Sequence, residues 1–154
     1  MTFINDLSGG NDMKKYEIGY TQGVFDMFHK GHLNLLLNAK EQCRYLIVGV
    51  NSDRLVEEYK HKKTVISEND RRYIIEHIDC VDKAIIADTL DKTVMWEKLK
   101  FDAIFIGSDW KGNPRWEETG RQLGKLGASL VYLPHTDGIS STMLREDKDK
   151  RATE

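Results

Sequence analysis

Two histidines that flank a glycine are the residues best suited to chemistry in this 154-residue sequence. His29 and His32 lie in the segment TQGVFDMFHKGHLNLLL, Thr21 to Leu37, and an apolar helical stripe begins directly after Gly31. The free N–H groups and the dipole of a helix N-terminus favour a bound phosphate, and imidazoles there can donate hydrogen bonds to it. The spacing therefore predicts a phosphate site. The alternative interpretation is a pair of surface histidines near a helix start.

Three other segments carry polar groups in expected loops. HTDGISST, His135 to Thr142, offers a glycine turn and hydroxyls at a helix start, which can bind phosphate or simply cap the helix. KHKKTVISENDRR, Lys60 to Arg72, contains a basic cluster that suits an anion or a solvated face. GSDWKG, Gly107 to Gly112, supplies the Asp109 carboxylate and Trp110, as a wall of a site or as simple packing.

Alternating strand and helix patterns must position these groups. We expect strands at Tyr16–Thr21, Tyr45–Val50, Val81–Ala87, Ala103–Gly107 and Ser129–Pro134, and helices after Gly31, at Glu68–Ile78, at Asp91–Lys100, from Pro114 to Gly127 and from near Ser140. This alternation predicts an α/β fold, a Rossmann-like doubly wound parallel sheet. Ligands in such sheets bind beyond the carboxyl ends of the strands, where the expected loops lie.

Composition sets limits on function. The formal net charge of −2 gives nucleic-acid binding no electrostatic support. No apolar run approaches the ~20 residues of a membrane span, and the first residues lack a secretory signal pattern. The two cysteines suit a reducing, cytoplasmic compartment. We expect one domain at 16–146, a flexible N-terminal arm at 1–15 and a charged C-terminal tail at 147–154.

The string Gly-x-Phe-Asp-x-x-His-x-Gly-His, from Gly23 to His32, resembles the signature of the cytidylyltransferase family within the HxGH nucleotidyltransferase superfamily. The GISST and GSDW segments are similar to its glycerol-3-phosphate branch, and the likeness extends over Tyr16–Glu146. It implies an enzyme that joins CTP to a small phosphorylated alcohol and releases pyrophosphate, with Mg²⁺ held mainly by the triphosphate and with a homodimeric assembly.

The resemblance also implies residue roles. His29, His32 and Lys62 would be catalytic. The nucleotide site would comprise Gly23, Val24, Phe25, His29, His32, Lys62, Asp109, His135, Thr136, Gly138, Ile139, Ser140, Ser141 and Thr142. Lys60, Arg71 and Lys92 would bind the acceptor, and no residue would hold a metal by itself.

Two positions depart from the family pattern. His135 and Asp79 stand where the resembled families usually carry arginine, and we hypothesise that Asp79 helps to select the acceptor. Three alternatives remain open: another phosphorylated acceptor such as phosphocholine, phosphoethanolamine or a sugar phosphate; an adenylyltransferase; and a catalytically inactive nucleotide-binding module.

Overall fold

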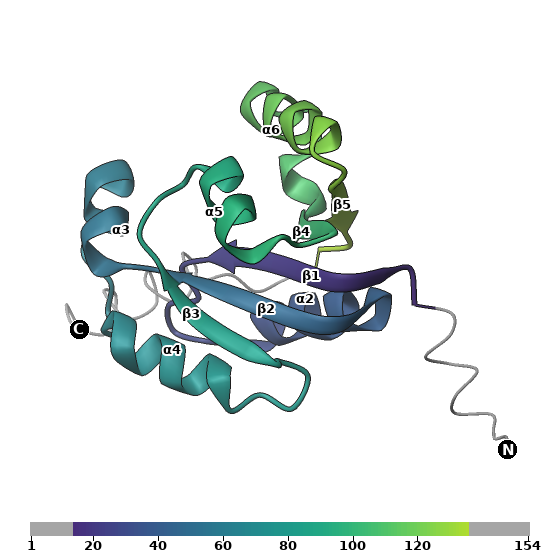
Figure 1. Ribbon diagram of the computed structural model, residues 1–154. Coiled ribbons are helices and arrows are strands. Elements are labelled where there is room, and N and C mark those ends of the chain that lie inside the picture. The colour runs from purple at the N-terminus through teal and green to yellow at the C-terminus, as the bar shows by residue number, and fades with distance from the viewer. Residues whose placement is uncertain (1–13, 136–154) are drawn as a thin grey trace, which may run out of the picture.

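The computed structural model describes residues 14–135, which form a five-stranded sheet with helices on both faces (Figure 1). The strands are β1 (Tyr16–Gly23), β2 (Cys43–Asn51), β3 (Lys83–Ala87), β4 (Ala103–Gly107) and β5 (Ser129–Leu133). Their order is β3-β2-β1-β4-β5 and every neighbouring pair is parallel. The predicted doubly wound parallel sheet is therefore confirmed, with its switch point between β1 and β4.

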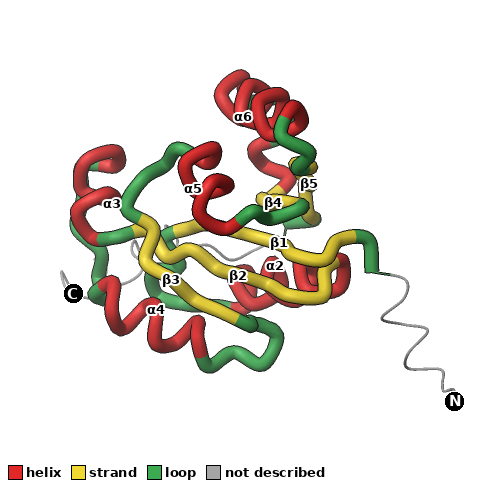
Figure 2. Tube along the Cα trace, in the orientation of Figure 1, coloured by secondary structure: helices red, strands yellow, loops and turns green. Residues whose placement is uncertain are grey.

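The helices form layers on the two faces of this sheet. They are α2 (Lys30–Gln42), α3 (Asp53–Lys60), α4 (Glu68–Glu76), α5 (Lys92–Leu99) and α6 (Pro114–Lys125), with a 3₁₀ turn, η1, at Ser108–Trp110. Figures 1 and 2 show α2 and α4 below the sheet and α5 and α6 above it. Consequently, groups on α2 and groups on α5 or α6 approach the carboxyl edge of the sheet from opposite sides.

The strand sequences explain why both faces are covered. In β2, Leu46, Val48 and Val50 belong to the apolar cluster that includes Leu36 of α2, whereas Ile47 joins a second cluster on the other face. A continuous apolar run of this kind is typical of a parallel strand that is buried on both sides. Each fully buried aliphatic side chain contributes roughly 1.5–3 kcal/mol to stability.

Gly49 in β2 makes room for the Tyr20 side chain. A Cβ atom at Gly49 would lie 2.2 Å from the Tyr20 hydroxyl oxygen, which is closer than real contacts allow. Tyr20 stacks on Phe101, with ring centroids 5.1 Å apart, and donates its hydroxyl to Gln22 Oε1 at 2.6 Å. Because Gly49 has no side chain, the Tyr20 ring fits against β2, and its hydroxyl can hold the Gln22 side chain near the end of β1.

Most expected elements are present, with boundaries shifted by a few residues. Ser67 caps α4, since its hydroxyl accepts from Asp70 N, and Asn113 caps α6 ahead of Pro114. The helix α3 was not predicted. The expected helix near Ser140, the C-terminal tail and nearly all of the N-terminal arm lie outside the described residues.

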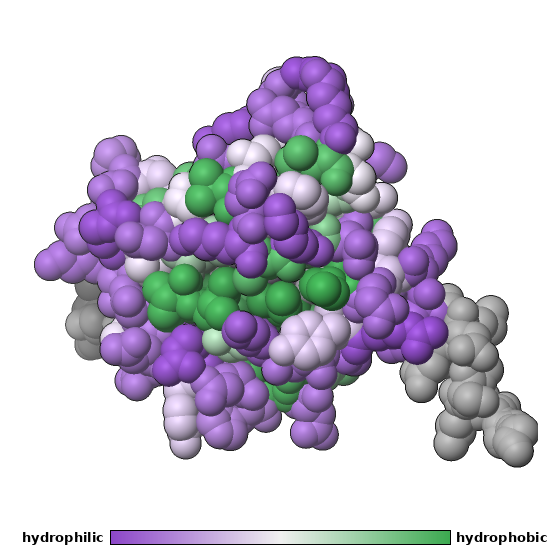
Figure 3. Space-filling model, viewed as in Figure 1, coloured by the Kyte–Doolittle hydropathy of each residue, from purple (hydrophilic) through white to green (hydrophobic). Residues whose placement is uncertain are grey.

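The described surface is mainly hydrophilic in the view of Figure 3, apart from a band of apolar side chains across the middle of this face, where Figure 1 places β2 and β3. β3 is an edge strand, and its central residues Ala84, Ile85 and Ile86 are only partly buried. Within residues 14–135, no helix combines the length and the apolar character needed to cross a membrane.

Candidate active site

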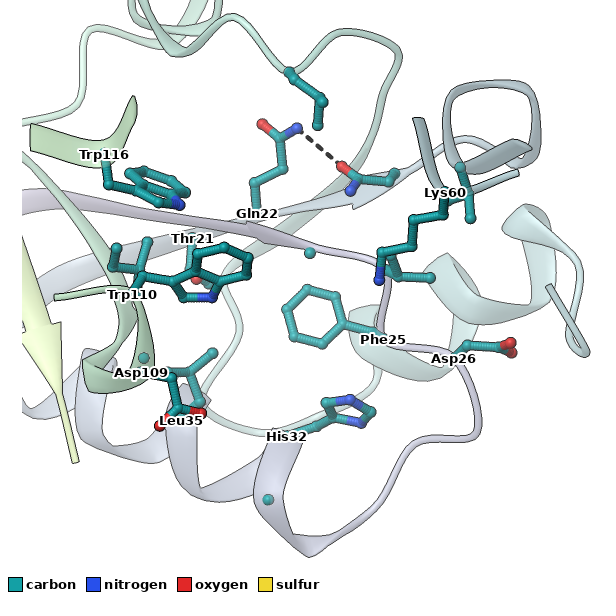
Figure 4. Close-up of a pocket in the computed structure, with 18 of the residues that line it drawn as sticks. Thr21, Gln22, Phe25, Asp26, His32, Leu35, Lys60, Asp109, Trp110 and Trp116 are labelled. Carbon is teal, nitrogen blue, oxygen red and sulfur yellow. Dashed lines mark hydrogen bonds between the residues drawn. The ribbon is translucent and has the colours of Figure 1, made fainter. Parts of the chain in front are cut away.

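A cavity of about 490 Å³ lies at the carboxyl ends of β1, β2 and β4, which is the switch point of the sheet (Figure 4). Its walls come from the β1–α2 loop, α2, α3, η1, the starts of α5 and α6, and the segment after β5. The predicted residues that line it are Gly23, Val24, Phe25, His29, His32, Lys60, Lys62, Lys92, Asp109 and His135. Residues that are up to about a hundred positions apart in the sequence thus line the same cavity.

The two histidines are held by the first turn of α2. His29 is the N-cap residue, and its Nδ1 accepts from Gly31 N at 3.0 Å. His32 Nδ1 accepts in return from His29 N at 3.2 Å, so the pair forms a reciprocal capping box. The rings stack with centroids 3.8 Å apart. Because each Nδ1 is an acceptor, each neutral imidazole carries its proton on Nε2.

Burial keeps both imidazoles neutral near pH 7. It lowers the pKa of His29, and it lowers the pKa of His32 to about 4, helped by the neighbouring His29 and opposed by Asp26. His29 Nε2 is buried and has no hydrogen-bond partner among residues 14–135. An unpaired buried donor costs about 1–3 kcal/mol, and a ligand oxygen that accepted from it would recover this energy. The arrangement can therefore act as a donor to an oxyanion.

A tight loop carries these histidines. Phe25 has φ 53°, in the left-handed region that a bulky residue seldom adopts, and its buried ring meets His32 edge-on, with centroids 5.5 Å apart. A Cβ atom at Gly23 would lie 3.2 Å from the Phe25 ring, so a larger residue at this position would crowd the ring. Strained backbone of this kind is common at functional sites, where the surrounding packing maintains it.

The segment that carries Lys62 is tied to the same loop. Asp26 is buried, and its two carboxylate oxygens accept from Val65 N at 2.7 Å and Ile66 N at 2.9 Å. His61, in the left-handed conformation, ends α3 just before Lys62. The hydrogen bonds from Val65 N and Ile66 N to Asp26 therefore anchor the segment that follows the basic cluster. Lys60 and Lys62 in this cluster line the cavity.

Arg71 does not line this cavity, contrary to its predicted role as an acceptor ligand. Its side chain is fully buried, and its guanidinium donates to Ile66 O at 2.8 Å, Val24 O at 2.7 Å and Asn51 O at 2.8 Å, as well as to the carboxylate of Asp53. Every guanidinium nitrogen is engaged within the protein. Arg71 therefore joins the loops after β1 and β2 to the segment before α4.

Lys92 lines the cavity, and its predicted role as an acceptor ligand stays a prediction. Its side chain is buried, its Nζ donates to Leu90 O at 2.7 Å, and the ammonium lies 5.0 Å from the centre of the Trp116 ring. Burial lowers the pKa of Lys92 to about 8; nearby Arg115 lowers it further, and Asp91 opposes this. The lysine is thus a cation in a partly desolvated position.

A polar chain between strand ends forms part of the cavity wall and was not predicted. Gln22 Nε2 donates to Asn51 Oδ1 at 2.9 Å, the bond drawn as a dashed line in Figure 4, and to Thr89 O at 2.9 Å. Asn51 Nδ2 donates to the Tyr59 hydroxyl at 3.1 Å. Arg115 and Trp116 of α6 were also missed. A sequence signal existed for Asn51, because it ends a strand in which the six residues YLIVGV form a largely apolar run, but not for Gln22, which follows the polar Thr21 in β1. None existed for the residues of α6.

Asp109 and His135 meet beyond the carboxyl ends of β4 and β5, with Asp109 Oδ2 3.1 Å from His135 Nδ1. The other predicted nucleotide contacts, Thr136, Gly138, Ile139, Ser140, Ser141 and Thr142, lie outside the described residues. Asp79 is exposed in the turn after α4, just before β3 begins. This is the amino edge of the sheet and Asp79 does not line the cavity, so its part in selecting the acceptor stays a prediction.

The carboxylates that line the cavity are Asp26 and Asp109, and the oxygens of Asp26 are already engaged. In the part of the chain that the structure describes, no three acidic, histidine or cysteine side chains form a metal-binding group. Asp109 fits a Mg²⁺ ion only as a single ligand or through a bound water, since Mg²⁺ prefers carboxylate, water and phosphate oxygens.

Comparison with known proteins agrees with this site. The chain is 38% identical over 128 residues to glycerol-3-phosphate cytidylyltransferase from Bacillus spizizenii, covering 82% of this chain and 93% of that protein. It is 32% identical to the Staphylococcus aureus protein of the same name, over 82% of this chain and 91% of that one. It is also 34% identical to the bifunctional protein HldE of Helicobacter pylori, over 87% of this chain but only 28% of the relative.

Solved structures share the fold. A lipopolysaccharide core biosynthesis protein from Thermoplasma volcanium superposes with a TM-score of 0.69 at 28% identity, covering 79% of this chain and 99% of that chain. A pantoate-β-alanine ligase from Francisella tularensis superposes with a TM-score of 0.60 at 13% identity, over 92% of this chain and 73% of that one, which shows likeness of fold alone. Residues 20–147 match the family model described as cytidylyltransferase-like, and the chain therefore belongs to that family.

Proposed function

We propose that this protein transfers CMP from CTP to the phosphate of a small phosphorylated alcohol of the glycerol 3-phosphate type, releasing pyrophosphate. The observation that carries the proposal is the histidine pair, whose Nδ1 atoms are engaged by backbone N–H groups so that Nε2–H is the available donor. The relatives named glycerol-3-phosphate cytidylyltransferases support the same activity.

The reaction is an in-line displacement. An oxygen of the acceptor phosphate forms a bond to the α-phosphorus of CTP, the bond from that phosphorus to the bridging oxygen breaks, and pyrophosphate leaves with the electron pair. A phosphate monoester is already a nucleophile, so no covalent intermediate is needed. His29 and His32 donate to the α-phosphate oxygens as charge develops there. Neutral donors held in place in this way commonly contribute 10²–10³ in rate.

The remaining groups divide between the two substrates. Lys60 and Lys62 both line the cavity. As the family resemblance implies, Lys62 neutralises the negative charge of the triphosphate and Lys60 that of the acceptor phosphate. Asp109 and His135 lie on the β4–β5 side, where the nucleoside binds. The predicted contacts from Thr136 to Thr142 would hold the β- and γ-phosphates. Mg²⁺ bound to the triphosphate would supply further charge neutralisation, with Asp109 as its protein ligand.

We also propose that the enzyme is a cytoplasmic homodimer. Cys43 and Cys80 are free thiols, which suits a reducing compartment. β3 is an edge strand with partly exposed apolar residues, and two-fold dimers are the commonest symmetric assemblies. Sedimentation that gave only monomer at micromolar concentration, with full activity, would remove this part of the proposal.

The activity is tested with His29→Asn and His32→Asn. Asparagine is a good N-cap, so His29→Asn keeps the helix start while it removes the Nε2–H donor. We expect kcat for pyrophosphate release to fall by ~10²–10³, with the urea unfolding midpoint nearly unchanged. His77→Asn, at an exposed histidine after α4, is the control and should retain full activity. CTP, ATP, GTP and UTP are compared as donors.

Near-normal turnover of both asparagine variants would refute the role of the histidines. Faster turnover with ATP than with CTP would replace the cytidylyltransferase by an adenylyltransferase. An absence of pyrophosphate release with all four nucleotides, despite measurable CTP binding, would favour an inactive nucleotide-binding module.

A further inference from the structure

We propose that the acceptor carries a carboxylate in addition to its phosphate, and that this carboxylate binds between Lys92 and Arg115 at the far end of the cavity from the histidines. The inference rests on the proposed function and names the substrate class of the same site. It depends on two cations that line the cavity and that form no ion pair within residues 14–135.

The first cation is Lys92 at the start of α5. Only 8% of the residue is exposed, yet it lines the cavity. Its contacts are a carbonyl oxygen, Leu90 O, and the face of the Trp116 ring. Neither contact carries a formal negative charge. A buried lysine normally pairs with a carboxylate, because removing an ammonium from water is costly.

The second cation is Arg115 in the first turn of α6. It lies near enough to affect the titration of both Lys92 and Tyr59. Residues 14–135 give Arg115 no ion pair. Asp91 is a counter-charge for Lys92, although its Oδ1 also accepts from Thr93 N, Thr93 Oγ1 and Val94 N as the cap of α5. Arg115 lowers the pKa of Lys92 more than Asp91 raises it, so the carboxylate of Asp91 only partly offsets the repulsion between the two cations.

This anion is not the reacting phosphate. That phosphate must meet the α-phosphate at the N-terminus of α2, beside His29 and His32. Lys92 and Arg115 come from α5 and α6, which cover the opposite face of the sheet (Figure 1). In Figure 4, Trp116, against which Lys92 lies, is across the pocket from His32. A small acceptor can extend between the two ends with its phosphate at one and its second charge at the other.

A carboxylate fits this end better than a second phosphate. The planar guanidinium of Arg115 matches a carboxylate with two parallel hydrogen bonds, and Lys92 adds a point charge. A carboxylate brings one negative charge to a site partly enclosed by Leu90 and Trp116. The smaller charge costs less to desolvate there than a phosphate dianion.

Two matched pairs of acceptors test the proposal with CTP. The first pair is glycerol 3-phosphate and 3-phosphoglycerate, which differ only by a hydroxymethyl or a carboxylate group. The second is phosphoethanolamine and O-phosphoserine, which differ only by a carboxylate. In at least one pair we expect the carboxylated member to have a kcat/KM higher by roughly tenfold or more, as for one charge-assisted contact. A three-carbon diol bisphosphate is the probe for a second phosphate.

Variants then assign the effect to the two cations. Lys92→Met and Arg115→Gln should each reduce the carboxylate preference, measured as the ratio of kcat/KM between the carboxylated and uncarboxylated members of a pair, by about tenfold and chiefly through KM. Arg121→Gln, further along α6 and paired with Glu118, is the matched control and should leave the preference unchanged.

Two results would overturn the proposal while leaving the transferase activity intact. One is equal or faster turnover of the uncarboxylated member in both pairs. The other is a carboxylate preference that survives in both variants. Faster turnover of the bisphosphate than of either carboxylated acceptor would replace the carboxylate by a phosphate. Loss of pyrophosphate release with every acceptor would instead contradict the proposed function itself, and this inference with it.

Discussion

Replacing Arg71 with methionine should destabilise the fold around the active site rather than weaken substrate binding selectively. The fully buried guanidinium satisfies three backbone carbonyls and the Asp53 carboxylate. Methionine fills much of the volume but donates no hydrogen bond. Each buried acceptor left unpaired costs about 1–3 kcal/mol, and breaking a buried ion pair from one side costs about 3–5 kcal/mol.

These contributions are not additive, because water can reach the exposed part of Asp53, whose side chain is 45% exposed. We therefore expect Arg71→Met to lose about 4 kcal/mol of unfolding free energy and Arg71→Lys somewhat less, since a lysine can restore one contact. For a chain of this length the melting temperature should fall by roughly 10 °C. Activity should fall through kcat, because the loops that hold His29 and Lys62 lose their common anchor.

Urea unfolding at pH 7, followed by circular dichroism, measures this loss. Arg72→Met is the matched control: it removes the neighbouring arginine, whose partner is Glu76 at the helix surface. Such exposed i,i+4 pairs contribute about 0.3–0.5 kcal/mol. Unfolding of Arg71→Met at the wild-type urea concentration, with only the acceptor KM raised, would refute this reasoning. Arg71 would then be the acceptor ligand that the sequence suggested.

Three further predictions concern charge and space. Lys92→Met should stabilise the protein at pH 7 by about 1–2 kcal/mol in urea unfolding: a pKa lowered from 10.5 to about 8 costs the charged folded state ~3 kcal/mol, less the lost contact with Trp116. In the wild type this cost is present below pH 8 and is relieved as pH rises toward 10.5. Because the pKa of His32 is lowered to about 4, the free energy of unfolding of the wild type should fall by up to ~3 kcal/mol as the pH is lowered from 6.5 to 4. Thermal unfolding should show a smaller fall for His32→Asn over the same pH range. Equal falls in the two proteins would contradict the burial of a neutral ring. Gly49→Ala should lower the melting temperature by several degrees, because its Cβ would lie 2.2 Å from the Tyr20 oxygen, and Gly107→Ala, with open space around it, should not.

The parts of this structure that the sequence predicts are those whose signals are local. The YLIVGV run identifies a strand buried on both faces without reference to anything else in the chain. The histidine site is equally local, because His29, Gly31 and His32 form both the helix cap and the donor pair within four residues. A motif that is contiguous in the chain needs no tertiary information beyond a helix that starts in the right place.

The parts that the sequence does not predict depend on contacts between distant segments. Arg71 looks like one member of a basic cluster, and only the fold shows that its guanidinium bonds Val24 O, 47 residues earlier. The helix α3 has a capping serine, Ser52, but its short apolar stripe lies beside a run of charges that favours a loop. Arg115 and Trp116 belong to a helix whose pattern suits simple packing on β5. Their approach to Lys92 follows from the position of α6 on the sheet.

The histidine pair shows why folding and chemistry are linked at this site. A serine at position 29 would cap α2 as well as histidine does, but its single hydroxyl would leave no second group for a ligand. A lysine would bring a donor and a charge but no acceptor for Gly31 N. Histidine has two nitrogens on opposite sides of one ring, so Nδ1 completes the helix start while Nε2 is available to an oxyanion. The backbone thereby fixes the tautomer that donates. A substitution that disturbs the cap must therefore also disturb the donor, and only a variant that keeps the cap, such as His29→Asn, measures the chemistry alone.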